Sequence, residues 1–184
     1  MSSYRSLLRR QSASRVGRSA PSRKKVLKYI AAASRAADHG GLEPWRFIEI
    51  RGKARQELGE AIATAAELKG MAFAKMVAKP FRAPLLIAIV AVRNPAREKK
   101  IPYWEQDAAA AGAAHYLSLL LDEAGWGVMW RTGQHVRKEP VRIFHHLEDN
   151  EELLGWLYVG NRTKQIKKPR GPHPSPELLL TTFD

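Results

Sequence analysis

The sequence contains no cysteine among its 184 residues. This absence excludes disulfide bridges, Cys-ligated zinc, iron–sulfur clusters and thiolate catalysis. Long apolar runs are missing too, since the longest, residues 83–92 and 108–114, are shorter than the roughly 20 residues that a membrane-spanning helix needs. The first residues lack the basic stretch and apolar run of a secretory signal peptide, so none is expected. We therefore expect a soluble, cytoplasmic protein without membrane association.

Acidic residues are absent from the first 37 positions, which hold ten of the 31 Lys and Arg. Of the net charge of +13, residues 38–184 contribute only +3. Such a segment fits a nucleic-acid arm, an organellar transit peptide, or an integral segment whose arginines bind one small anion. The third is favoured, because apolar residues at helical spacing continue the segment into a helix over residues 22–37. A solvated basic face without a special partner remains an alternative.

The remaining composition is that of a folded domain. Hydrophobic residues make up 45% of the chain, and the length suits one domain over residues 1–184. An apolar strand at residues 85–92 is typical of burial on both faces. We expect an α+β fold with a mixed central sheet flanked by helices, and an extended tail from residue 160. The predicted helices are 4–10, 22–37, 53–70, 71–79, 104–124 and 139–147, and the predicted strands are 45–51, 85–92, 126–131 and 153–159.

Common catalytic and nucleotide-binding motifs are missing. Gly125 and Gly127 begin a glycine-rich pattern, but Trp130 replaces its third glycine and a strand follows where a helix is required. There is no Walker loop, HExxH or GxSxG. His145 and His146 are adjacent, so on a helix their rings diverge by about 100° and cannot easily share one ion. They are interpreted as helix-surface residues, and no metal site is predicted.

Polar residues cluster instead at the ends of predicted elements. Arg10 and Ser12 follow a helix on irregular backbone, where a guanidinium fork, a hydroxyl and free amides suit a phosphate. Arg131 follows an apolar strand and precedes a glycine, a place where charge is more often functional than structural. Arg35 closes a helix, where the helix dipole alone would favour it. A basic stretch at residues 167–170 belongs to the same dispersed set.

Six short segments together resemble a known family. They are RQSASR (10–15), ADHGGLEPWRF (37–47), PFRAP (80–84), PYWEQ (102–106), WRTG (130–133) and LYVG (157–160). Their order and spacing are similar to those of the flavin-dependent nitroreductase family, in particular its short bacterial, YdjA-like branch. The resemblance covers nearly the whole chain. It implies a nitroreductase-like fold of two intertwined subunits, with two FMN molecules at the dimer interface and a nicotinamide cofactor as reductant.

The resemblance also implies roles for individual residues. The phosphate and ribityl contacts correspond to Arg10, Gln11 and Ser12. Flavin contacts from the partner subunit correspond to Arg35 and His39. Contacts with the isoalloxazine and ribityl chain correspond to Trp130, Arg131 and Thr132, and a basic residue near the C-terminus, Lys168 or Arg170, would complete the phosphate site.

Three positions depart from the family pattern. Gln11 replaces a common second arginine, which weakens the anion site. Glu43 stands where Gln is usual before Pro-Trp, and Gly41 stands where larger members have Asn. These departures bear on substrate and cofactor affinity more than on the fold.

The implied function is an FMN-dependent NAD(P)H oxidoreductase, a nitroreductase that reduces nitroaromatic, quinone or similar small-molecule acceptors by ping-pong hydride transfer through flavin N5. No catalytic side chain is needed, because the flavin carries the chemistry. The expected state is a homodimer, since Arg10 and His39 would serve one flavin from two subunits and the small-residue run 108–114 would need a partner. The alternatives are an FMN-binding protein without turnover and a basic nucleic-acid-binding protein, which lacks a recognised motif and stacking aromatics.

Overall fold

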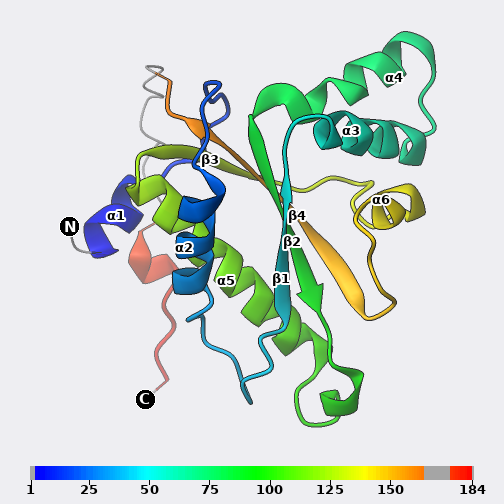
Figure 1. Ribbon diagram of the computed structural model, residues 1–184. Helices are drawn as coiled ribbons and strands as arrows, with labels where there is room; N and C mark the ends of the chain where they lie inside the picture. The colour runs from blue at the N-terminus through cyan, green and yellow to red at the C-terminus, as the bar shows by residue number, and fades with distance from the viewer. Residues whose placement is uncertain (1–2, 164–174, 184) are drawn as a thin grey trace.

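The computed structural model describes residues 3–163 and 175–183, and it builds an α+β fold (Figure 1). Element types follow the predicted order along the chain. The helices are α1 (Ser3–Arg9), α2 (Arg23–Ala33), α3 (Ala54–Ala65), α4 (Gly70–Val77), α5 (Tyr103–Glu123) and α6 (Glu139–Phe144), with short 3-10 turns η1 (Lys79–Arg82), η2 (Pro95–Arg97) and η3 (Pro176–Leu178). The strands are β1 (Trp45–Ile50), β2 (Leu85–Val92), β3 (Trp126–Arg131) and β4 (Glu151–Asn161).

Helices cover both faces of the sheet, which explains the apolar β2. On one face, Val26 of α2 and Leu117 of α5 pack against Ile87 and its neighbours. On the other face, Leu58 of α3 and Val141 of α6 form a second core with alternate residues of the same strands. Figure 1 shows α2 and α5 on one side of the strands and α3, α4 and α6 on the other. The expectation that β2 is buried on both faces is therefore confirmed.

The predicted mixed sheet is wrong for the described residues, whose strands pair only antiparallel in the order β1-β2-β4-β3. The cause lies in the connection after β1. Helices α3 and α4 pack on each other and return the chain to the end of the sheet at which β1 finishes, so that Leu86 pairs with Ile50. A parallel neighbour would have needed a connection that crosses the sheet, usually through a helix.

A bulge interrupts the pairing of β2 with β4. Ile89 pairs with Gly155 and Val90 pairs with Leu153, so Leu154 is the extra residue. The indole Nε1 of Trp130 donates a hydrogen bond of 3.1 Å to the carbonyl of Leu154. This hydrogen bond links the bulge to the residue before Arg131.

The small-residue run of α5 is used within the chain. Ala110 and Ala113 are fully buried and pack against Trp45 of β1 and Ala91 of β2. The chain's own sheet therefore covers this part of the run, and a partner subunit for the rest of it stays a prediction. Separately, no helix among the described residues is long and apolar enough to cross a membrane.

Candidate functional site

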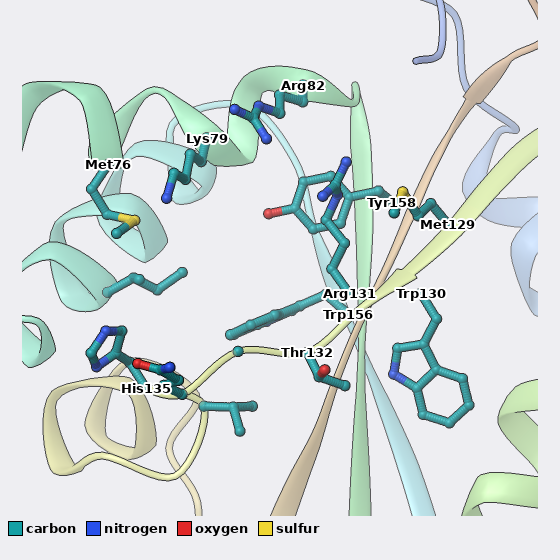
Figure 2. A pocket seen from close by; sticks show the side chains of 14 residues that line it. Met76, Lys79, Arg82, Met129, Trp130, Arg131, Thr132, His135, Trp156 and Tyr158 are labelled. Carbon is teal, nitrogen blue, oxygen red and sulfur yellow. The ribbon is translucent and has the colours of Figure 1, made fainter. Parts of the chain in front are cut away.

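A cavity of about 510 Å³ lies beside the end of β3, on the sheet face covered by α3 and α6 (Figure 2). One wall comes from α3, α4 and η1, the floor from β3 and β4, and the remaining wall from the loop after β3. Its lining residues are Ile62, Met76, Lys79, Arg82, Met129, Trp130, Arg131, Thr132, Gly133, Gln134, His135, Val136, Trp156 and Tyr158.

The cavity is basic and has no carboxylate in its lining. Lys79, Arg82 and Arg131 contribute three positive charges. The Arg131 guanidinium lies over the ring of Tyr158, with its Cζ atom 5.2 Å from the ring centroid. Burial raises the pKa of Tyr158, although the nearby Arg131 and Arg82 act in the opposite direction. The phenol therefore stays neutral near pH 7 and remains available as a hydrogen-bond donor.

Two buried side-chain nitrogen atoms in this lining have no hydrogen-bond partner, and no other buried side-chain nitrogen or oxygen of the described residues lacks one. They are Nε of Arg131 and Nδ1 of His135. Buried polar groups are normally satisfied, so two exceptions in one cavity indicate a place where a ligand or water completes the bonding. This is the strongest sign of a binding site in the described chain.

The segment that carries Lys79 and Arg82 is braced from α3. Nη1 of Arg55 donates a 2.8 Å hydrogen bond to the carbonyl of Ala83. The same guanidinium lies 4.7 Å from the ring centroid of Phe81, a cation–π contact. The two contacts hold η1 at the mouth of the cavity.

Gly155 allows the end of β3 to lie close to β4. Its φ is +119°, and an added Cβ would stand 2.5 Å from the carbonyl oxygen of Arg131 and 2.9 Å from Nε1 of Trp130. Any side chain there would displace the backbone that presents Arg131. Glycine is required at this position for close approach as well as for its dihedral angles.

The N-terminal segment lies along the outer edge of β3. The amide of Ala13 donates a 2.8 Å hydrogen bond to Val128. Gly127 makes room for this contact, since a Cβ there would meet Val16 at 2.8 Å and Ala13 at 3.1 Å. The glycine pattern that fails as a nucleotide loop therefore serves packing. It places Arg10, Gln11 and Ser12 beside the strand that ends in Arg131.

Arg35 and His39 lie elsewhere. They follow α2, in a loop that leads into the start of β1, whereas Arg82 precedes β2 at the opposite end of the sheet. Nδ1 of His39 lies 2.7 Å from a carboxylate oxygen of Glu105 at the start of α5. This contact ties the loop to α5.

The ten residues suggested by the resemblance thus fall into separate groups. Trp130, Arg131 and Thr132 line the cavity. The set Arg10, Gln11 and Ser12 borders the same strand without lining the cavity, and Arg35 and His39 are remote from it within one chain. Lys168 and Arg170 lie outside the described residues.

Sequence reasoning missed Lys79, Arg82, His135, Trp156 and Tyr158 as site residues. The motif PFRAP contains Arg82, but the sequence analysis uses this motif only as part of the family resemblance. A cation between a proline-flanked turn and a wholly apolar strand was the available signal. It is the same signal that identified Arg131.

The interpretation of His145 as a helix-surface residue is wrong. Its exposed fraction is 3%, and it follows the last turn of α6. Its Nδ1–H donates to the Val141 carbonyl at 2.7 Å, so Nε2 accepts the indole N–H of Trp156 at 3.0 Å. Burial lowers the pKa of His145 to about 4, so the ring is neutral at pH 7. Among the described residues, no group of three His, Asp or Glu side chains could hold a metal ion.

Comparisons with known proteins agree with this architecture. The nitroreductase family model matches residues 7–161. The protein named "Putative NAD(P)H nitroreductase YdjA" from Escherichia coli K12 is 32% identical over 181 residues, covering 96% of this chain and 97% of that protein.

Two solved structures show the same fold. A nitroreductase-like family protein from Bacillus cereus has a TM-score of 0.84 at 20% identity, covering 99% of this chain and 96% of the other. A mutant of the FMN and NADPH-dependent nitroreductase NfnB, from sphigopyxis sp. strain HMH, has a TM-score of 0.78 at 18% identity, covering 99% of both chains. The chain described here therefore belongs to the nitroreductase family.

Proposed function

We propose that this protein is an FMN-dependent NAD(P)H oxidoreductase that reduces nitroaromatic, quinone or similar small-molecule acceptors. The observation that carries the proposal is the acid-free cavity at the end of β3, where Arg131 keeps a buried Nε atom without a partner. The nicotinamide reductant is supported by the name of the YdjA relative, and FMN by that of NfnB.

The residues at this place suit a flavin. Arg131 and Thr132 would bind the ring and the ribityl chain, and a cation there would stabilise the anionic reduced ring. Arg10 and Ser12 would bind the phosphate through charge-assisted hydrogen bonds. Arg10 makes no side-chain hydrogen bond or ion pair in the described part of the chain, which leaves its guanidinium available.

When bound, FMN would supply two-electron chemistry, accepting a hydride from NAD(P)H and passing it to the acceptor. The chain's own residues would bind the flavin and orient it. No side chain has to act as a general acid, because the flavin would carry the chemistry.

The proposal includes a homodimer. Arg35 and His39 are remote from the cavity of their own chain, so they would complete the flavin site of a partner. Large apolar side chains are exposed on α1, on α5 and at the C-terminal end, and surfaces of this kind mark interfaces. They are Tyr4, Leu7, Leu8, Trp104, Tyr116, Leu178, Leu179, Leu180 and Phe183.

The visible spectrum of the purified protein tests the proposal. We expect the absorption of bound flavin, and its bleaching when NADPH is added without oxygen. Flavin that resists bleaching by both NADPH and NADH would indicate a binding protein without turnover. A colourless protein that gains no absorption after incubation with FMN would contradict the proposal and favour the nucleic-acid alternative.

A further inference from the structure

The basic wall of the cavity belongs to η1, whose cations have no role in the flavin contacts proposed above. Lys79 and Arg82 form no ion pair with any described residue, and both line the cavity. Arg55 and Phe81 hold their segment in place. A braced pair of unpartnered cations at a cavity wall is a device for binding an anion.

The rest of the lining is aromatic and apolar. Trp156 and Tyr158 are nearly fully buried beneath the cavity, while Met76, Met129 and Ile62 add apolar surface. Figure 2 shows Lys79 and Arg82 on the side of the cavity that faces Tyr158, with Arg131 between this wall and the end of β3. The cavity volume is within the range of small-molecule sites. A flat ring with one anionic substituent matches this combination.

We propose that the cavity selects aromatic electron acceptors that carry an anionic group such as a carboxylate, and that Lys79 and Arg82 bind this group. The inference rests on the proposed function. In the overall reaction with a nitroaromatic acid, NAD(P)H and one proton convert the nitro group to a nitroso group, giving NAD(P)⁺ and water. The two electrons come from the nicotinamide, and the carboxylate stays unchanged as the binding handle.

The test compares 4-nitrobenzoate with nitrobenzene, which lacks only the carboxylate. For the wild-type holoenzyme we expect kcat/KM to favour 4-nitrobenzoate by about tenfold, because a charge-assisted hydrogen bond is worth about this factor. The ratio should fall towards one in the double variant Lys79→Ala/Arg82→Ala. It should stay unchanged in Lys75→Ala, which removes an exposed α4 cation outside the cavity. A wild-type ratio near one would overturn the inference and leave the proposed function intact.

Direct binding gives a readout that does not depend on turnover. Calorimetric titration of the purified protein should show 4-nitrobenzoate binding about tenfold more tightly than nitrobenzene, with the difference lost in the double variant. Equal binding of the two compounds would overturn the inference, whether or not the protein holds flavin. A protein without flavin would contradict the proposed function instead.

Two other anions could use the same cations, and each has its own outcome. If Lys79 and Arg82 bind the FMN phosphate, the double variant will lose FMN but keep its affinity for riboflavin. If they bind the extra phosphate of NADPH, the variant will lose its preference for NADPH over NADH while the acceptor ratio stays unchanged. Either result would overturn the inference.

Discussion

Arginines at two places along β4, beside its start and beside its middle, differ in their partners. Where β4 begins, Arg46 makes a bidentate ion pair with Glu151, both bonds being 2.6 Å, and Arg93 makes a second with Asp107. Near the middle of β4, Arg131 pairs with Trp156 and has no carboxylate among its described neighbours. Charges that hold the fold are paired within the chain. Charges left unpaired beside a cavity indicate a ligand.

The largest expected loss of stability comes from breaking the ion pair between Arg46 and Glu151. Arg46→Ala would leave Glu151, whose side chain is 7% exposed, as a buried charge without its partner. Removing one member of such a pair costs about 3 kcal/mol, and we expect this loss in the free energy of unfolding at pH 7. Denaturant titration measures it, and Arg46→Met/Glu151→Leu should recover most of the loss. A loss below about 1 kcal/mol for Arg46→Ala would show that the pair is not structural.

A pH effect of similar size is expected at the same end of the sheet. The pKa of His145 is about 4 in the folded protein and about 6.5 when unfolded, so the unfolded state binds the extra proton between these values. The stability from the neutral ring is complete above pH 6.5 and is lost as pH falls to 4, by about 3 kcal/mol.

Unfolding titrations between pH 4 and 7 measure the His145 effect. In His145→Gln, which keeps an acceptor for the Trp156 indole, the slope over this interval should shrink. The exposed neighbour gives the control, and His146→Gln should keep the wild-type slope. Identical slopes in the wild type and His145→Gln would refute this account.

Arg10 in the N-terminal segment is a second arginine without an ion pair among the described residues, so it extends the comparison with Arg46. Arg10→Ala should weaken FMN binding by about 1.5–3 kcal/mol, and Arg10→Lys should recover only part of this because it loses the two-pronged geometry. FMN occupancy after dialysis is the measurement. Flavin that remains bound should still be reduced by NAD(P)H. Equal occupancy in the wild type and Arg10→Ala would exclude Arg10 as a phosphate ligand.

A smaller effect is expected from moving this segment without removing its side chains. In Gly127→Ala the new methyl group would lie 2.8 Å from Val16, so the N-terminal segment that carries Arg10 must shift. We expect FMN occupancy to fall several-fold, with about 1 kcal/mol lost from the free energy of unfolding. Gly112→Ala is the matched control, because its new Cβ would meet only Ala36, at 4.0 Å, and Gly112 does not line the cavity. Unchanged occupancy in Gly127→Ala would mean that this packing does not position the flavin site.

The sequence predicted elements where local chemistry decides the structure. Strands β2 and β3 were placed to the residue, because apolar runs end at a polar or charged residue. The predicted helix 53–70 is longer than α3, because the chain turns at Glu67 with a φ of +54°. No proline or glycine stands at this turn to predict it. The antiparallel pairing escaped prediction because it depends on how two helices pack.

The candidate site divides in the same way. Arg131 could be identified from its own neighbours in sequence. Arg82 carried a similar local signal, but the meeting of Lys79 and Arg82 with Arg131 could not be predicted, because it depends on the pairing of β2 with β4 and of β4 with β3. The burial of His145 likewise follows from a contact with Trp156, eleven residues away on another element. Non-local contacts of this kind have no periodicity to reveal them.

The contrast between paired and unpaired arginines is tested most directly at Arg131. In Arg131→Ala, measured beside the wild type, we expect FMN occupancy to fall about tenfold or more. The free energy of unfolding of the flavin-free proteins should change by less than about 1 kcal/mol, because no ion pair is broken. Both forms must be flavin-free, since a bound ligand adds stability. Full FMN occupancy together with a loss of about 3 kcal/mol would contradict the account, since Arg131 would then hold the fold as Arg46 does.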